Sequence, residues 1–431
     1  MSLAGAALSR GALAADLREH FFRPAPTLHT RPAIGAEAEL LALSAATRRP
    51  CPIEPAPGEL ATLPVLRRLA ARGGWHEEQT AHGAPKFRLP DGSLLSYEPG
   101  GQLELSSAPA TSVGALVAAL HAGVLPLRAA MREAGIELLS VGIDPFNALE
   151  ATPLRLTGER YARMAAYFAR RGAAGARMMR QTAAFQVNLD WAADAGERAL
   201  QWQVLNAAAP YLTAIFAGSP RYADRPSGYA SYRAQCWREL DPLRTGALPA
   251  AGDGADEYLE FALRAPWMLH PTAAGEHLPL AEWLRRDDLS FAAWRLHLTT
   301  LFPEVRPKGY LEVRGLDALE PAWYAAPLVL LSGLVYAPAA LRAAAALLGR
   351  PDDAALLARA ARCGLADPEI RRGALALWEI GLWGAAELGP AFVEPPLLER
   401  AREFAGLYTR AGRAPGHDVL AWCGECSRPR L

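Results

Sequence analysis

Residues 91–109 read DGSLLSYEPGGQLELSSAP, and they contain residue types well suited to chemistry. The Pro-Gly-Gly sequence at 99–101 predicts a tight turn between two short strands. Glu98 precedes the turn, and alternation along the second strand places Gln102, Glu104 and Ser106 on one face. The bend thereby brings two carboxylates and an amide together, and hard divalent cations take such oxygen ligands. For one strand alone, a half-exposed strand with a solvated face is the favoured interpretation, so the prediction of a cation site depends on whether the pattern recurs.

The pattern recurs in three more predicted strands, at 34–43, 182–191 and 309–315. Their polar faces carry Glu37 and Glu39, then Gln186, Asn188 and Asp190, and finally Tyr310, Glu312 and Arg314. A sheet face exposed to water would carry mixed Lys, Arg, Thr and Ser instead. If the strands line one sheet, their carboxylates repel one another unless Mg²⁺ or Mn²⁺ bridges them. Arg314 and nearby Lys308 would then contact phosphate oxygens, so we predict a nucleotide-dependent phosphoryl-transfer or ligase site built on a sheet.

Motifs of several other enzyme classes do not occur in the sequence. There is no GxxxxGK(S/T) and no GxGxxG, which counts against P-loop and Rossmann folds, and there is no HExxH or paired-Cys zinc pattern. The formal net charge is +0, so nothing indicates a nucleic-acid or membrane-surface partner. We therefore expect small-molecule substrates.

The composition indicates a globular protein, with 51% hydrophobic and 21% charged residues. Five cysteines in 431 residues and an N-terminus interrupted by charges predict a cytoplasmic location without a signal peptide. The segment 321–341 (PAWYAAPLVLLSGLVYAPAAL) is long and apolar enough to span a bilayer. Three prolines and a Ser-Gly pair break it, so we expect one or two buried helices instead.

Helices are predicted around the strands by apolar periodicity and by capping residues. They lie at 9–22, 58–72, 113–134, from Thr157 to about 172, and at 197–217, 256–270, 279–286, 339–349, 352–363, 367–388 and 395–411. Ser112 is the predicted N-cap of the third of these. Residues 219–249 read as a loop-rich segment dense in Arg and aromatic residues. We expect a catalytic domain over residues 1–345 and a helical extension over 346–431 packed on it.

Five segments carry a resemblance to a known family. They are IGAEAEL, YEPGGQLELS, MMRQTAAFQVNLD, CWRELDPLRTGALP and HLTTLFPEVRPKGYLEVRG. In this order they resemble the plant and bacterial type of glutamate–cysteine ligase (γ-glutamylcysteine synthetase) from about residue 34 to 341. The family belongs to the glutamine synthetase-like carboxylate–amine ligases, so the resemblance implies an α+β fold, an antiparallel sheet funnel with outer helices. It also implies that ATP phosphorylates the γ-carboxylate of L-glutamate and that the amino group of L-cysteine displaces the phosphate.

The resemblance implies roles for individual residues. The expected Mg²⁺ ligands are Glu37, Glu39, Glu98, Glu104 and Glu312, and Mn²⁺ could replace Mg²⁺. Arg314 and Lys308 are expected to stabilise the transferring phosphoryl group. Arg233 and Trp237 match an Arg-x-x-x-Trp pair associated with glutamate recognition, since an Arg fork suits an α-carboxylate. Further candidates for substrate contact are Arg160, Gln186 and Asn188.

The sequence also departs from the family pattern. Gln181 stands where plant relatives carry Arg, which predicts a missing or moved anionic contact. The cysteines that form regulatory disulfides in plant enzymes have no clear counterparts. We interpret the Cys423–Cys426 pair as incidental and Cys236 as a buried structural residue.

Several alternatives stay open at this point. The acceptor could be an amine other than cysteine, or the scaffold could serve a binding protein without catalysis. The product could enter glutathione or ergothioneine synthesis, and the length and the tail YTRAGRAPGHDVL lean towards the ergothioneine branch. A monomer and a homodimer are both compatible with the sequence.

Overall fold

The structure is a computed structural model. It describes residues 8–23, 32–56, 58–80, 83–250, 252–270, 277–286, 289–348 and 354–426, with side chains up to residue 423. Of the cysteine pair at the C-terminus, the side chain of Cys426 therefore lies outside the described residues.

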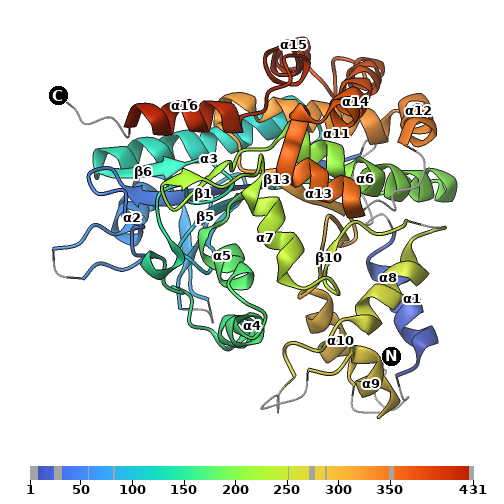
Figure 1. Cartoon of the computed structure of the whole chain (residues 1–431), viewed down its shortest axis with the longest axis horizontal. Coiled ribbons are helices and arrows are strands. Elements are labelled where there is room, and N and C mark those ends of the chain that lie inside the picture. The colour runs from blue at the N-terminus through green and yellow to red at the C-terminus, as the bar shows by residue number, and fades with distance from the viewer. Residues whose placement is uncertain are drawn as a thin grey trace.

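An antiparallel sheet organises the chain (Figure 1). Within the described residues it has nine strands in the order β12-β13-β7-β1-β5-β4-β3-β2, with β6 paired to the far end of β1. The strands are β1 (Ile34–Ser44), β2 (His76–Glu78), β3 (Lys86–Arg88), β4 (Leu94–Tyr97), β5 (Leu103–Ser106), β6 (Ile136–Leu139), β7 (Ala184–Leu189), β12 (Val305–Pro307) and β13 (Leu311–Asp317). Every pairing within it is antiparallel, and the prediction of an antiparallel sheet with helices around it is confirmed.

The register of the four central strands brings the predicted polar faces together. Glu39 lies opposite Glu104 across β1 and β5, and Glu37 lies opposite Gln186 across β1 and β7. Asn188 on β7 lies opposite Glu312 on β13. Because side chains alternate with a period of two, residues directly opposite one another project from the same face. One face of β13, β7, β1 and β5 is therefore the surface on which the site is built.

Apolar helices cover the other face of the sheet. They are α3 (Val113–Glu133), α6 (Ala195–Ile215) and α11 (Ala325–Tyr336). The predicted cap of α3 is confirmed, since the Ser112 side chain accepts a hydrogen bond from the backbone N–H of Ala115. Residues 325–335 of α11 are all buried, as expected for the apolar segment 321–341. By length and composition, α3 or the pair formed by residues 321–336 and 338–348, bent by 94°, could also cross a membrane; here both contribute to the core.

The C-terminal helices pack on this layer. They are α12 (Pro338–Leu348), α13 (Ala354–Cys363), α14 (Pro368–Glu387), α15 (Pro395–Phe404), a π-helical turn (Ala405–Arg410) and α16 (Gly416–Cys426). α14 packs directly on α11, so closely that a Cβ on Gly333 would overlap the carbonyl oxygen of Gly381. One hydrophobic core spans both sides of the predicted domain boundary, and that boundary at residue 345 stays a prediction.

Shorter helices lie on the open side of the sheet (Figure 1). They are α4 (Glu159–Ala169), α5 (Ala174–Gln181), α7 (Tyr232–Leu240) and α10 (Phe291–Leu298), while α1 (Arg10–His20), α2 (Thr62–Gly73), α8 (Ala255–Arg264) and α9 (Leu280–Arg285) flank the sheet and this group. The predicted Thr157 cap is wrong, since α4 begins at Glu159 after Gly158. α7 lies inside the segment predicted as a loop, where Ser231 caps it by accepting from the N–H of Ala234.

Candidate active site

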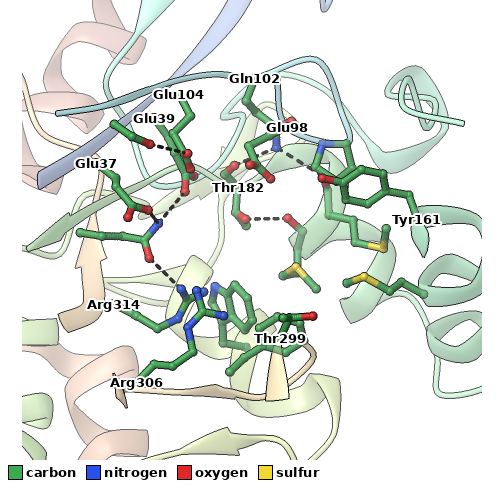
Figure 2. A pocket seen from close by; sticks show the side chains of 18 of the residues that line it. Glu37, Glu39, Glu98, Gln102, Glu104, Tyr161, Thr182, Thr299, Arg306 and Arg314 are labelled. Atoms are coloured by element: carbon green, nitrogen blue, oxygen red, sulfur yellow. Dashed lines mark hydrogen bonds between the residues drawn. The ribbon is translucent and has the colours of Figure 1, made fainter. Parts of the chain in front are cut away.

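A cavity of about 330 Å³ lies on the open face of the sheet (Figure 2). The predicted residues that line it are Glu37, Glu39, Glu98, Glu104, Arg160, Gln186, Trp237, Lys308 and Arg314. Asn188, Arg233 and Glu312 contact these lining residues directly. The structure therefore brings all twelve predicted site residues to one region, although they come from six separate segments of the chain.

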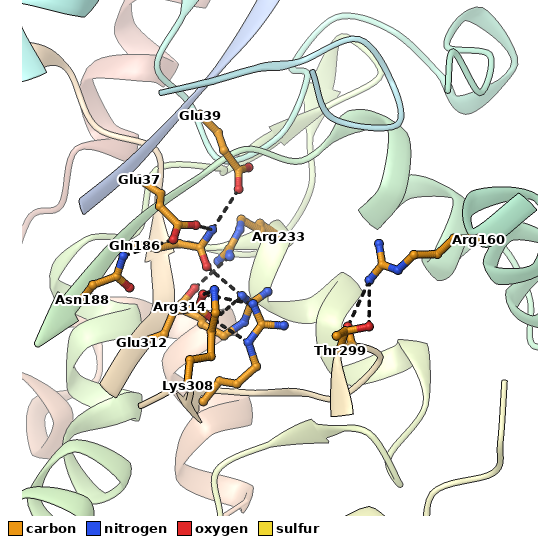
Figure 3. Close-up of polar contacts among 11 residues, drawn as sticks. Glu37, Glu39, Arg160, Gln186, Asn188, Arg233, Thr299, Lys308, Glu312 and Arg314 are labelled. Atoms are coloured by element: carbon orange, nitrogen blue, oxygen red, sulfur yellow. Dashed lines mark hydrogen bonds and ion pairs between the residues drawn. The ribbon is translucent and has the colours of Figure 1, made fainter. Parts of the chain in front are cut away.

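Four carboxylates form the acidic wall of the cavity, which we define as Glu37, Glu39, Glu98 and Glu104. Gln186 Nε2 donates to Glu37 Oε2 at 3.1 Å and to Glu39 Oε1 at 3.2 Å (Figure 3). Asn188 Nδ2 donates to Glu37 Oε1 at 3.1 Å. The two amides of β7, together with the backbone N–H of Ala184, which donates to Glu39 Oε2 at 2.8 Å, thus fix the carboxylates of β1 beside the cavity.

The electrostatics of the acidic wall are unfavourable in the protein alone. Burial raises the pKa of Glu39 to about 7. Burial, together with the charges of Glu39 and Glu37, raises the pKa of Glu98 to about 8. Burial and the neighbouring carboxylates also raise the pKa of Glu104 well above its usual value. Grouped carboxylates of this kind are stabilised by protons or by cations.

A tight turn positions Glu98. A Cβ on Gly100 would overlap the carbonyl oxygen of Arg180, and Gly101 has a φ of +92°, so both positions require glycine. Gln102 lines the cavity, but its amide is bound to the backbone: its Oε1 accepts from the N–H of Gly100 at 2.9 Å and its Nε2 donates to the carbonyl of Thr182 at 2.9 Å. The EPGGQ sequence therefore builds a rigid support for one carboxylate.

The opposite side of the cavity is the basic wall, which we define as Arg306, Lys308 and Arg314 (Figures 2 and 3). All three contact the carboxylate of Glu312, with donor–acceptor distances of 2.6 Å, 3.0 Å and 2.7 Å respectively. Burial alone would raise the pKa of Glu312, but the three cations outweigh it and hold that pKa well below its usual range. One carboxylate cannot neutralise three cations, so the basic wall keeps a net positive charge facing the cavity.

Gln186 connects the two walls. Its Oε1 accepts from Arg314 at 2.7 Å while its Nε2 donates to the acidic wall. The amide is oriented by its partners, because only the oxygen can accept from Arg and only the nitrogen can donate to carboxylates. The cavity is therefore bipolar, with the charges held apart by neutral amides.

Arg233 lies behind the basic wall. Its side chain is buried, it donates to the carbonyl oxygen of Arg314 at 2.8 Å, and it pairs with Asp317 at 3.7 Å. The ring of Trp237 lies between the two arginines, 5.9 Å from the guanidinium carbon of Arg233 and 5.6 Å from that of Arg314. The Arg-x-x-x-Trp pair thus lies one helical turn apart on α7, with the tryptophan in the cavity and the arginine at its margin.

The remaining wall comes from α4 and α5. Arg160 donates to the carbonyl of Thr299 at 3.1 Å and thereby connects α4 to the segment after α10 (Figure 3). Arg306 and Tyr161 are among the lining residues that were not sequence candidates. Arg306 could have been found, since it alternates with Lys308 inside the FPEVRPKG segment, whereas Tyr161 carries no motif.

A second cavity of about 320 Å³ adjoins the first along the sheet. Its lining includes Asp190 and Tyr310, and it shares Glu37, Ser106 and Lys308 with the first cavity. The ring of Tyr310 lies 5.3 Å from Lys308 Nζ. An elongated ligand could therefore extend from one cavity to the other past these shared residues.

The residues that depart from the family pattern lie outside the cavity. Gln181 is buried and donates to the carbonyl of Asn147, so this position is structural here. Cys236 is fully buried, and burial raises its pKa to about 12, which agrees with the structural interpretation. Cys423 is also buried.

Comparison with known proteins identifies the family. The model of the glutamate–cysteine ligase family 2 (GCS2) matches residues 33–380. The chain is 38% identical to the glutamate–cysteine ligase EgtA of Mycolicibacterium smegmatis over 75% of its own length and 77% of that protein. It is 33% identical to the chloroplastic glutamate–cysteine ligase of Arabidopsis thaliana over 66% of its length and 55% of that protein.

A solved structure is also similar. The glutamate–cysteine ligase of Francisella tularensis in complex with AMP superposes with a TM-score of 0.52 at 13% identity, over 91% of this chain and 84% of that one. At this identity the match shows a shared fold. Together with the family match over most of the chain, it means that this protein belongs to the glutamate–cysteine ligase family 2.

Proposed function

We propose that this chain ligates L-glutamate and L-cysteine at the expense of ATP. A γ-carboxylate oxygen of glutamate attacks the γ-phosphorus of ATP and releases ADP. The amino nitrogen of cysteine then attacks the acyl carbon of γ-glutamyl phosphate, the bond from that carbon to the phosphate oxygen breaks, and γ-glutamylcysteine, phosphate and a proton are the products. The observation that carries this proposal is the bipolar cavity, since phosphoryl transfer needs both cation-binding oxygens and cationic side chains.

The arrangement supports a place for each substrate. ATP would extend through the second cavity past Tyr310, so that its terminal phosphate meets the basic wall near Lys308. Glutamate would lie in the first cavity against Trp237 and Arg160, with Arg233 available to its α-carboxylate. Gln186 and Asn188 would orient the acidic wall and, through Arg314, the group being transferred.

The residues present fit a divalent cation at the acidic wall. The Glu98 carboxylate has no hydrogen-bond or ion-pair partner among the residues that the structure describes, and the pKa values of Glu39, Glu98 and Glu104 are raised. Within the described residues no three acidic, His or Cys side chains are already close enough to hold an ion by themselves. Mg²⁺ commonly binds one or two carboxylates and completes its coordination shell with water and substrate phosphates. This fits carboxylates that are spread along the acidic wall. When bound, the ion would neutralise charge on the phosphates.

Glu312 has a different environment from the acidic wall. Its carboxylate is fully buried and contacts three cations. Its two oxygens accept four hydrogen bonds from these cations, and a carboxylate has about four lone-pair sites. We therefore propose that Glu312 orients the basic wall, and its role as a cation ligand stays a prediction.

Removal of divalent cations should make stability depend on pH. In EDTA, the free energy of unfolding is expected to fall as the pH rises from about 7 to about 8.5, because the folded carboxylates bind protons that the unfolded chain has already lost. Buried His297, whose pKa is lowered to about 3, is neutral in the folded state, and an unfolded histidine is mostly deprotonated above pH 7, so it contributes little in this window. Urea denaturation at each pH measures how the free energy of unfolding changes with pH.

Two further measurements test the charge assignment. Mg²⁺ with ADP should stabilise the protein more at pH 8.5 than at pH 7. In EDTA, the variant E98Q should reduce the slope of the free energy of unfolding against pH. A slope that E98Q leaves unchanged would contradict the charge assignment.

The proposed activity is tested by ADP release from the purified protein with Mg-ATP, L-glutamate and a panel of amines. Cysteine-dependent ADP release with a product of the mass of γ-glutamylcysteine is the expected result. Glutamate-dependent ADP release with a different amine would support the proposed site but assign that amine, instead of cysteine, as the acceptor. The absence of ADP with every acceptor from folded protein would overturn the proposal and favour a binding protein.

A further inference from the structure

A third cavity, also of about 330 Å³, lies far from the proposed chemistry. It is enclosed by α3, β6, the segment after β13, the π-helical turn and α16, which runs along α3 in Figure 1. Among the described residues, it shares no lining residue with the bipolar cavity or with the cavity beside Tyr310. It is therefore a separate site, and it does not depend on the proposed function.

The lining of this cavity combines aromatic rings with acidic groups. The rings belong to Trp323, Tyr408 and Trp422, and the charged groups are Arg128, Glu137, Glu320 and Asp418. One arginine thus faces three carboxylates. Such a combination of aromatic side chains and negative charge is the chemistry that binds organic cations.

Ion pairs neutralise two of the three carboxylates. Arg128 binds Glu320 through two hydrogen bonds of 2.6 and 3.2 Å, and Asp418 accepts from Arg413 at 2.9 Å. The side-chain carboxylate of Glu137 makes no hydrogen bond or ion pair within the described part of the chain, although its charge also attracts Arg128. It therefore carries the excess negative charge of the cavity.

A buried hydroxyl also lacks a partner. Ser140 is 6% exposed, it lines the cavity, and its Oγ has no hydrogen-bond partner among the described residues. Leaving a buried hydroxyl unsatisfied is unfavourable by about 1–3 kcal/mol, so a polar group in the cavity would be stabilising. The lining thus presents an anion, aromatic rings and a free hydroxyl to one small volume.

We propose that this cavity binds a small substituted ammonium compound that carries a hydrogen-bonding group. The ammonium contacts Glu137 and the aromatic rings, and the hydrogen-bonding group pairs with Ser140. An anionic ligand is disfavoured by the excess of carboxylates. A purely apolar ligand would leave both Glu137 and Ser140 without a partner.

Choline tests the proposal, because its quaternary nitrogen cannot act as an acceptor amine in the ligase reaction. The full chain is titrated with choline by calorimetry, and in parallel with the uncharged isostere 3,3-dimethyl-1-butanol. Saturable 1:1 binding of choline, at least about tenfold tighter than that of the alcohol, is the expected result.

Variants locate the binding. E137Q should weaken choline binding by about tenfold, whereas the control E387Q, at an exposed glutamate of α14, should leave it unchanged. V419W should fill the cavity and abolish binding, with its melting temperature and circular dichroism showing that the fold persists. Equal binding of the uncharged alcohol, unchanged affinity in E137Q, or displacement of choline by Mg-ATP and glutamate would each overturn the proposal.

Discussion

Replacing Glu104 by glutamine is expected to abolish catalysis and to stabilise the ligand-free protein. The carboxylate lies opposite Glu39 across two strands and lines the acidic wall, so its loss removes a proposed cation ligand. ADP formation should fall by about 10³-fold or more, the loss typical of a group that acts on transition-state charge. The glutamine side chain has nearly the same shape and can still accept the hydrogen bond from Ser106 Oγ.

The gain in stability follows from the raised pKa of Glu104. At a pH above the pKa that Glu104 has in the unfolded chain, folding must either protonate its carboxyl or place its charge beside the other three carboxylates of the acidic wall. Both disfavour the folded state increasingly as the pH rises. In EDTA at pH 8, E104Q should melt about 1–3 °C above the parent protein, with a smaller gain at pH 5.

A glutamate on the same sheet provides the control. Glu77 on β2 is paired with Arg67 at 2.9 Å, which lowers its pKa. E77Q should therefore keep full activity and should not gain stability. Differential scanning calorimetry with an ADP assay measures both effects. Parent-like turnover in E104Q, or a lower melting temperature than the parent at pH 8, would contradict the assignment of Glu104 to the acidic wall.

The polar faces of the strands could be predicted because alternation is a local property of the sequence. Residues such as Glu37 and Glu39 share a face in any extended conformation. The turn after Glu98 was equally predictable, since a proline followed by two glycines strongly favours a turn. The family motifs then added Arg233 and Trp237, for which alternation gives no signal.

The pairing of the strands could not be predicted in the same way. β1 lies between β5 and β7, and β7 is 78 residues or more away from β5 along the chain; nothing local specifies that order. The contact of Glu312 with three cations was not foreseen for a different reason: it depends on the pairing of β12 with β13, which places Arg306 opposite Glu312, and only the second of these strands was predicted. Helix α7 was missed since its nine residues are dominated by polar and aromatic side chains, and packing rather than periodicity stabilises it.

Replacing Arg314 by lysine is expected to slow phosphoryl transfer with little effect on the binding of ATP. The guanidinium donates to both Gln186 and Glu312 at 2.7 Å, so it is held rigidly between the two walls. Lysine keeps the charge but lacks the planar fork, and it cannot keep both contacts while facing a phosphoryl group. Single-turnover ADP formation should fall by about 10²–10³-fold, while the dissociation constant of Mg-ATP should change by less than about threefold.

The expected effect of R314K depends on the charge that remains in the basic wall. Arg306 and Lys308 still contact Glu312 when Arg314 is changed, so that buried carboxylate keeps its partners and the fold should persist. R400K, at an exposed arginine of α15 that pairs with Glu403, is the matched control and should behave like the parent. If R314K instead kept the single-turnover rate and raised the KM for glutamate alone, Arg314 would be a substrate-binding residue, and the stabilisation of the transferred group would fall to Arg306 and Lys308.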